Sequence, residues 1–306
     1  MSDMSDMSTD DLDTDRKPWR GVMVATALPL RADLSVDFDR YGEHVRWLVD
    51  SGCDGVCPNG SLGEYQSLTP DERAQVVRTA VDAVGGDRVM PGVGAYGAAE
   101  SRRWAEQARA AGAGSVLLLP PNAYRADDRI VAAHYAEVAK AGLPIVAYNN
   151  PHDTKVDLTP PLLARLHGEG HIAAVKEFSG DVRRPYEIAE LAPDLELLIG
   201  ADDVLLELAI AGAKGWIAGY PNALPAASVA LYRAAVAGDL ARAVPLYRAL
   251  HPLLRWDSRT EFVQAIKLSM DIAGRYGGPC RAPRLPLAAE QEKTVRAATE
   301  AFLAKG

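Results

Sequence analysis

The chain has 306 residues, of which 48% are hydrophobic, and it carries a formal net charge of −8. This length suits one large α/β domain or two small ones. Because acidic and basic residues are interspersed and the balance is acidic, neither nucleic acid nor an anionic membrane surface is expected as a partner.

The ends of the chain and its cysteines bear on where the protein resides. Residues 1–17 combine a short repeat with an acidic run and few apolar side chains, which predicts a disordered tail. There is no basic-then-apolar signal peptide and no run of the ~18 to 20 apolar residues that a membrane span needs. Cys53, Cys57 and Cys280 are too few and too scattered for a disulfide framework. We therefore expect a cytoplasmic protein.

From Gly21 onward, short apolar runs alternate with amphipathic segments at intervals of about 25 to 30 residues, the length of one strand–helix unit. Thr69, Pro70 and Glu72 mark one helix start as a capping box with proline at the first helical position. Eight consecutive units predict a closed (β/α)8 TIM barrel over residues 18–238. The eight apolar runs are Gly21–Leu30, Cys53–Pro58, Arg88–Val93, Ser115–Leu119, Pro144–Tyr148, Ile172–Lys176, Leu195–Ile199 and Gly215–Gly219.

Residues 239–306 contain no further strand pattern, and their sequence predicts helices alone. Breaks are expected at His251-Pro252 and within residues 277–286. This part predicts a C-terminal helical extension packed on the barrel or on a neighbouring subunit.

Lys176 is the sharpest candidate for a catalytic residue. In a TIM barrel the active site lies at the carboxyl ends of the strands, and Lys176 closes an apolar run. Removal of water from an ammonium group favours the neutral amine, which is the form that attacks a carbonyl. A salt bridge with a neighbour such as Glu177 is the alternative. The other seven lysines fall in the tail, in helices or in turns.

Two further strand ends carry residues suited to the same chemistry. Tyr148 ends the run before that of Lys176, where its phenol could move protons, although a packing role is the alternative. After the second run, Gly60, Ser61 and Leu62 precede Gly63, and successive backbone N–H groups there could bind a carboxylate.

Nucleotide and metal sites are poorly supported. Residues 92–97 match G-x-G-x-x-G, but in the third unit and without an acidic residue ending the next strand, so a glycine-rich barrel loop is favoured. The six histidines show no metal-ligand spacing, and no metal is expected. Only His152 stands near a strand end, as a possible substrate contact.

The G-S-L-G-E loop at 60–64, the Y-N-N-P sequence at 148–151 and the V-K-E-F-S-G-D sequence at 175–181 together resemble the dihydrodipicolinate synthase and N-acetylneuraminate lyase family. The resemblance covers residues 21 to about 303. It implies a TIM barrel with C-terminal helices, usually a homotetramer, in which a lysine forms an imine with pyruvate or a longer 2-oxo acid and no separate cofactor takes part. By this resemblance Lys176 is the imine lysine, Tyr148 relays protons with Ser61, and the Ser61 and Leu62 amides hold the carboxylate.

The sequence departs from the synthase pattern in ways that matter for substrate. Leu62 replaces a threonine of the synthase loop, and Tyr124 is out of register with the family's paired tyrosines. The arginine that binds the second substrate's carboxylate in the synthase is replaced by Asp153, which would repel an anionic aldehyde.

We therefore expect a Schiff-base-forming aldolase or dehydratase of a hydroxylated 2-oxo acid. The synthase itself, a deaminase of a hydroxyproline-derived pyrroline carboxylate and a noncatalytic 2-oxo-acid-binding barrel stay open as alternatives. The residues expected at the mouth of the site are Asn150, His152, Asp153, Tyr124 and Tyr220.

Overall fold

The computed structural model describes residues 17–305, so the predicted tail lies outside the described residues except for Lys17. Within this range seven parallel strands form one sheet in the order β2-β1-β7-β6-β5-β4-β3. The strands are β1 (Gly21–Ala25), β2 (Gly55–Cys57), β3 (Val116–Leu118), β4 (Ile145–Asn149), β5 (Ala174–Glu177), β6 (Glu196–Ile199) and β7 (Gly215–Ala218).

Residues 89–93 close the ring between β2 and β3. The Met90 N–H donates to the Val56 carbonyl (2.9 Å), and the Val93 N–H donates to the Leu117 carbonyl (3.0 Å). Pro91 has no N–H to donate, which limits this segment to isolated bridges. The predicted barrel is confirmed as a nearly closed parallel barrel with helices. The prediction of a regular third strand at residues 88–93 is wrong, because this segment forms only isolated bridges.

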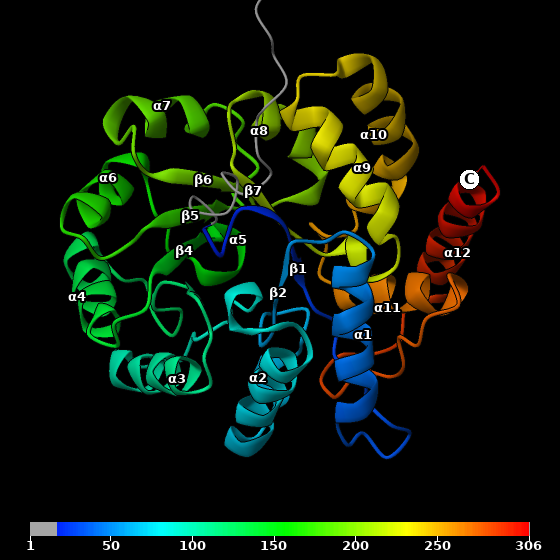
Figure 1. The fold of residues 1–306 in the computed structure, drawn as a ribbon, viewed down its shortest axis with the longest axis horizontal. Coiled ribbons are helices and arrows are strands. Elements are labelled where there is room, and N and C mark those ends of the chain that lie inside the picture. The colour runs from blue at the N-terminus through cyan, green and yellow to red at the C-terminus, as the bar shows by residue number, and fades with distance from the viewer. Residues whose placement is uncertain (1–16, 306) are drawn as a thin grey trace, which may run out of the picture.

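Helices surround the strands (Figure 1). The capping box at the start of α2 is confirmed, because Thr69 Oγ1 accepts from Glu72 N (3.2 Å) and Glu72 Oε2 accepts from Thr69 N (2.9 Å). The helices of the barrel are α1 (Phe38–Asp50), α2 (Pro70–Val84), α3 (Ala98–Ala110), α4 (Asp128–Ala139), α5 (Pro151–Thr154), α6 (Pro160–Gly168), α7 (Arg184–Leu191), α8 (Leu205–Ile210) and α9 (Pro225–Val236), with single turns η1 (Tyr65–Ser67), η2 (Gly86–Arg88), η3 (Asp202–Val204) and η4 (Tyr220–Asn222).

The C-terminal helical segment consists of α10 (Leu240–Leu254), α11 (Phe262–Ile272) and α12 (Ala289–Leu303). It packs back on the barrel, with α10 against α9 and η3, and α11 against η4. The predicted break at His251-Pro252 is wrong, because α10 continues to Leu254. Pro252 removes one backbone hydrogen bond, and the burial of Leu250, Leu253 and Leu254 on both sides of it keeps the last turn helical.

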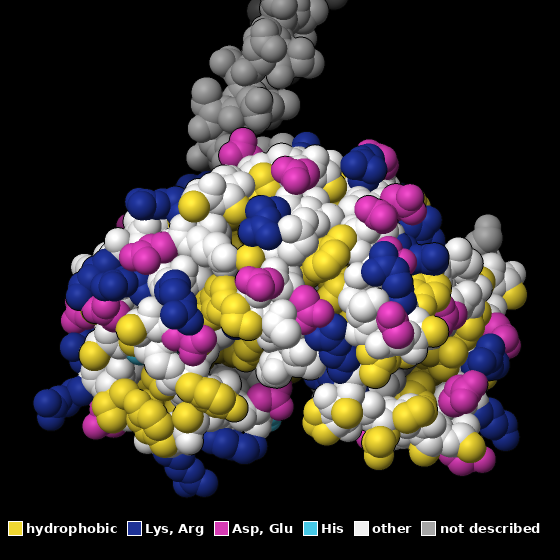
Figure 2. Space-filling model, turned by 90° about the horizontal axis from the view of Figure 1, so that it is seen from below, with side chains coloured by type: hydrophobic (Ala, Val, Ile, Leu, Met, Phe, Trp, Pro, Cys, Tyr) yellow, Lys and Arg dark blue, Asp and Glu magenta, His cyan; other side chains and the backbone are white. Residues whose placement is uncertain are grey.

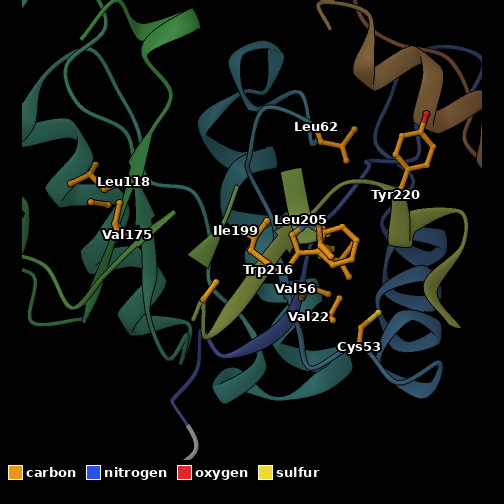
Figure 3. Packing of buried hydrophobic residues seen from close by; sticks show 14 of the residues in the cluster. Val22, Cys53, Val56, Leu62, Leu118, Val175, Ile199, Leu205, Trp216 and Tyr220 are labelled. Carbon is orange, nitrogen blue, oxygen red and sulfur yellow. The ribbon is translucent and has the colours of Figure 1, made fainter. Parts of the chain in front are cut away.

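Alternation along the strands divides the apolar side chains into two layers. On β5, Ala174 faces the barrel interior with Met23 and Leu198, whereas Val175 belongs to the layer between strands and helices. Figure 3 shows members of that outer layer, among them Val175 and Trp216. Because alternate residues share a face, Lys176 points inward with Ala174.

On the face shown in Figure 2, basic and acidic side chains are interspersed, as the sequence predicts. None of the helices within residues 17–305 combines the length and the apolar character needed to cross a membrane.

Candidate active site

A cavity of about 890 Å³ lies at the carboxyl ends of the strands. Its wall comes from the loops after β2 to β7 and from the segment between α10 and α11. Most of the predicted site residues line it: Gly60, Ser61, Leu62, Tyr148, Asn150, His152, Asp153 and Lys176.

Lys176 reaches the cavity from β5 and is 6% exposed. It pairs in register with Tyr148 of the adjacent strand β4. Its Nζ lies 4.2 Å from the centroid of the Tyr148 ring and 5.5 Å from that of Phe178. Two aromatic faces thus hold the amine at the base of the cavity.

Glu177, the alternative partner of Lys176, points to the opposite face of β5. Its carboxylate accepts from Asn149 Nδ2 (3.0 Å) and from the Ser179 N–H (2.6 Å), and Arg184 lies 3.8 Å away. Among residues 17–305, no carboxylate forms an ion pair with Lys176. The strand-end salt bridge is therefore not formed, and the amine is available to a ligand.

Tyr148 presents its hydroxyl to the same cavity, where Asn150 Nδ2 donates to it (3.4 Å). Burial raises the pKa of Tyr148, and the neighbouring Lys176 ammonium opposes that rise. The phenol is therefore protonated near neutral pH and can donate its proton in a catalytic step.

The loop after β2 is shaped to present its backbone. Asn59 and Glu64 both adopt left-handed conformations (φ 56° and 53°) and bracket the loop. Within the described part of the chain, the N–H groups of Ser61 and Leu62 donate to no protein acceptor. A Cβ at Gly63 would lie 3.2 Å from the Thr26 carbonyl oxygen, so this glycine allows close packing on β1.

Glu64 has a structural role in this loop. Its Oε1 accepts from Lys267 Nζ (2.7 Å) and its Oε2 accepts from the Arg281 N–H (2.9 Å). Both side chains of the Glu64–Lys267 ion pair are 2% exposed. This pair ties the loop to α11.

The short helix α5 sets one rim of the cavity. Asn150 caps it by accepting from the Asp153 N–H (3.2 Å), and its Nδ2 donates to Asp153 Oδ2 (2.8 Å). The His152 Nε2 lies 3.1 Å from the Ser179 carbonyl oxygen. The Asp153 carboxylate is thus fixed at the rim.

Two predicted substrate contacts lie off the cavity in the described structure. Tyr124 is 54% exposed, in the loop before α4, and Tyr220 is buried in η4, where its N–H donates to Asp202 Oδ2 (3.3 Å). The Tyr220 prediction placed the side chain by its closeness to a strand end in sequence, but the chain turns into η4 and carries the ring into the core.

The cavity also contains residues that the sequence reasoning missed. Asp203 follows β6, and the rule of strand ends would have found it. Tyr65 follows the G-S-L-G-E loop directly. Asp257 belongs to the segment between α10 and α11, and no local pattern marks it.

The first half of the loop at 92–97 is buried against protein, so its glycines do not present a phosphate cradle. A Cβ on Gly92 would lie 2.3 Å from the Asn59 carbonyl oxygen, and one on Gly94 would lie 3.8 Å from Tyr65 Oη. Within residues 17–305 no group of three or more histidine, cysteine or acidic side chains is arranged to hold a metal ion.

A model of the dihydrodipicolinate synthetase family matches residues 18–302, nearly the whole described chain. The chain belongs to this family. As a family member it is an enzyme, a lyase of the Schiff-base-forming class. Among the relatives, a 4-hydroxy-tetrahydrodipicolinate synthase of Methanothrix thermoacetophila is 34% identical over 91% of this chain and 95% of its own. A protein of Halobacterium salinarum described as an uncharacterised DapA-like lyase is also 34% identical, over 93% of each chain.

Solved structures of the dihydrodipicolinate synthetase family share the fold. The dihydrodipicolinate synthase of Aquifex aeolicus superposes with a TM-score of 0.88 at 28% identity, covering 93% of this chain and 98% of that one. YagE of E. coli, solved in complex with pyruvate, has a TM-score of 0.86 at 26% identity over 93% of this chain and 98% of its own.

Proposed function

We propose that Lys176 forms an imine with a small 2-oxo acid. The enzyme then breaks a carbon–carbon or carbon–oxygen bond at a hydroxylated carbon of that substrate. The observation that carries this proposal is the position of the Lys176 amine, 4.2 Å from the Tyr148 ring centroid at the base of a cavity of about 890 Å³. The covalent imine is the electron sink, so the chemistry requires no separate cofactor.

In this proposal Lys176 Nζ attacks the keto carbon, the resulting carbinolamine loses water, and the protonated imine withdraws electrons from the neighbouring carbon. Tyr148, assisted by Ser61, moves the protons of these steps. The substrate carboxylate binds the free N–H groups of Ser61 and Leu62, and Gly60 permits its close approach. Asn150 and His152 contact the rest of the substrate at the rim.

Asp153 argues for a substrate other than that of the synthase. The family resemblance places an arginine there in synthases, and a fixed carboxylate repels an anionic aldehyde. Arg259 and Arg284 also line the cavity, from the C-terminal segment. A distal anionic group would therefore bind on their side of the mouth.

The names of the relatives support the synthase itself as the second candidate function. A deaminase of a hydroxyproline-derived pyrroline carboxylate is the third, because such a substrate also carries a hydroxyl group two carbons from its imine carbon. The family assignment favours all three over a noncatalytic 2-oxo-acid-binding barrel.

A turnover panel tests the proposal. The purified protein is assayed with 2-oxo-3-deoxygluconate, 4-hydroxy-2-oxoglutarate and pyrroline-4-hydroxy-2-carboxylate, and separately with pyruvate plus aspartate semialdehyde. We expect turnover of 2-oxo-3-deoxygluconate or 4-hydroxy-2-oxoglutarate at a kcat/KM above that of the condensation and above that of pyrroline-4-hydroxy-2-carboxylate, whose preferred turnover would instead identify the deaminase. Efficient condensation with no turnover of the panel would identify the synthase and contradict the proposal.

The homotetramer and the cytoplasmic location implied by the sequence also stay proposals. Light scattering of the purified protein tests the first, with a mass four times that of the chain as the expected result. A monomer or dimer would contradict it.

A further inference from the structure

A buried carboxyl group of the barrel and a half-buried carboxyl group of the C-terminal segment lie close to the same glycine beside the cavity. A Cβ on Gly219 would lie 2.7 Å from Asp257 Oδ1 and 3.6 Å from Asp202 Oδ2. Both carboxyl groups therefore converge on the backbone of Gly219, and a larger residue at that position would displace them.

The two members of this acidic pair differ in what they contact. Asp202 Oδ1 accepts from Trp216 Nε1 (2.9 Å), and its Oδ2 accepts from the N–H groups of Gly219 (3.2 Å) and Tyr220 (3.3 Å). These hydrogen bonds give Asp202 a structural role, because they fix the turn after β7. Asp257 lines the cavity, and Asp202, at 0% exposure, does not reach it.

Asp257 is held in place by its neighbours. Trp256 is fully buried, and the Asp257 N–H donates to the Leu254 carbonyl (3.0 Å) at the end of α10. Ser258 Oγ donates to Asp203 Oδ1 (2.9 Å), which joins this segment to the loop after β6. Among the described residues, Asp257 forms no ion pair, so its half-buried position is not explained by a structural salt bridge.

The net effect of its surroundings raises the pKa of Asp257 to about 7: burial is the main cause, Lys176 opposes the rise, and Asp203 adds to it. Burial and the neighbouring Asp257 raise the pKa of Asp202 as well. The charged and titratable groups around the pair are Lys176, Asp203, Tyr148, Tyr220 and Tyr247. The pair therefore retains a proton near neutral pH, and its cavity-facing member can deliver it.

We propose that Asp257 is a catalytic acid that protonates the hydroxyl group leaving carbon 4 of a 4-hydroxy-2-oxo acid bound to Lys176. This proposal rests on the proposed imine. It deepens the proposed function by assigning the reaction as dehydration and the substrate class as 2-oxo acids with a hydroxyl group on carbon 4.

Dehydration in this site consists of one proton removal and one proton delivery. A proton leaves carbon 3 to the Tyr148 relay, and its electron pair forms the double bond between carbons 2 and 3 of a neutral enamine. The enamine returns to the protonated imine as a double bond forms between carbons 3 and 4, the bond between carbon 4 and oxygen breaks, and the departing oxygen takes the Asp257 proton to leave as water. The proton taken from carbon 3 restores the carboxyl group, so no oxidant or reductant is consumed.

The test separates this step from imine formation. Wild type and Asp257→Asn are compared in two reactions. The first is exchange of the methyl protons of pyruvate in deuterium oxide, which needs the imine and the Tyr148 relay but no leaving-group acid. The second is dehydration of the panel substrate with the highest kcat/KM. Asp257→Asn should slow dehydration about 10²–10⁴-fold more than it slows exchange, as expected for loss of a general acid. Wild-type kcat/KM should fall as pH rises through the pKa of the acidic pair, and the variant should lose this alkaline limb.

Glu261→Gln is the matched control, since it removes a carboxylate from the same segment that does not line the cavity. It should keep the wild-type rate and pH profile. The proposal is overturned if Asp257→Asn keeps the dehydration rate or the alkaline limb, if it loses exchange as strongly as dehydration, or if the wild type releases pyruvate and an aldehyde. Absence of exchange in the wild type would instead contradict the imine itself.

Discussion

Lys176 and Tyr148 are register partners on adjacent strands, and the lysine amine lies 4.2 Å from the centre of the tyrosine ring. Paired residues of neighbouring parallel strands share a face, so both side chains must enter the barrel together. The relative position of amine and phenol is therefore set by the sheet and not by mobile loops.

Replacement of Tyr148 by phenylalanine should lower kcat/KM for the best panel substrate by about 10²–10⁴-fold, because the ring remains and the proton-relay hydroxyl is lost. The variant should still bind substrate, since the aromatic face over Lys176 is kept. Steady-state kinetics measures the effect. A rate within a few-fold of the wild type would show that another group moves the protons.

Asp153→Arg should raise the rate at which the enzyme condenses pyruvate with aspartate semialdehyde, because it replaces a repulsive carboxylate at the rim with a cation. A coupled assay of the condensation product measures the change, with Asp153→Asn as the control that removes charge alone. Robust condensation by the unmutated protein would contradict the role given to Asp153.

Lys267→Met should lower the free energy of unfolding by about 3–5 kcal/mol, because it leaves the buried Glu64 carboxylate without its ionic partner. Arg296→Gln, which breaks an exposed pair with Glu292, should cost at most about 1 kcal/mol. Urea denaturation compares the two. Adding Glu64→Gln to Lys267→Met should recover part of the loss, and an equal cost for both single variants would refute the account.

The ion pair between Glu72 and Arg281 should make stability depend on pH in acid. The Arg281 guanidinium lowers the pKa of Glu72 from 4.5 to about 2, so the folded state favours the carboxylate. This contribution is fully present above the unfolded pKa and is lost as pH falls from about 4.5 to about 2. Melting temperatures of wild type and Glu72→Gln should therefore converge across that window, and a constant difference would contradict the pairing.

Much of the fold follows from local pattern. The apolar runs and helix starts predict the barrel, and the position of Lys176 at the end of such a run predicts its entry into the cavity. Pro91 shows the limit of that approach, because a segment can be apolar and correctly placed yet lack one N–H group that a regular strand needs.

The parts of the site that were missed depend on contacts distant in sequence. Asp257 reaches the cavity because Trp256 is buried and α10 packs on the barrel, and neither fact is written in the residues around it. Tyr220 shows the opposite error, because it was predicted at the mouth of the site and does not line the cavity. Although it lies near a strand end in sequence, the chain turns into η4 and its side chain enters the core. Side-chain direction after a strand end is set by the turn that follows.

Borohydride reduction in the presence of pyruvate, followed by peptide mass measurement, tests the central claim most directly. The reduced protein should carry one pyruvate-derived mass on the peptide that contains Lys176, and Lys176→Ala should carry none. An unmodified wild-type protein, or an adduct on a different lysine, would contradict the assignment of Lys176 as the imine-forming residue.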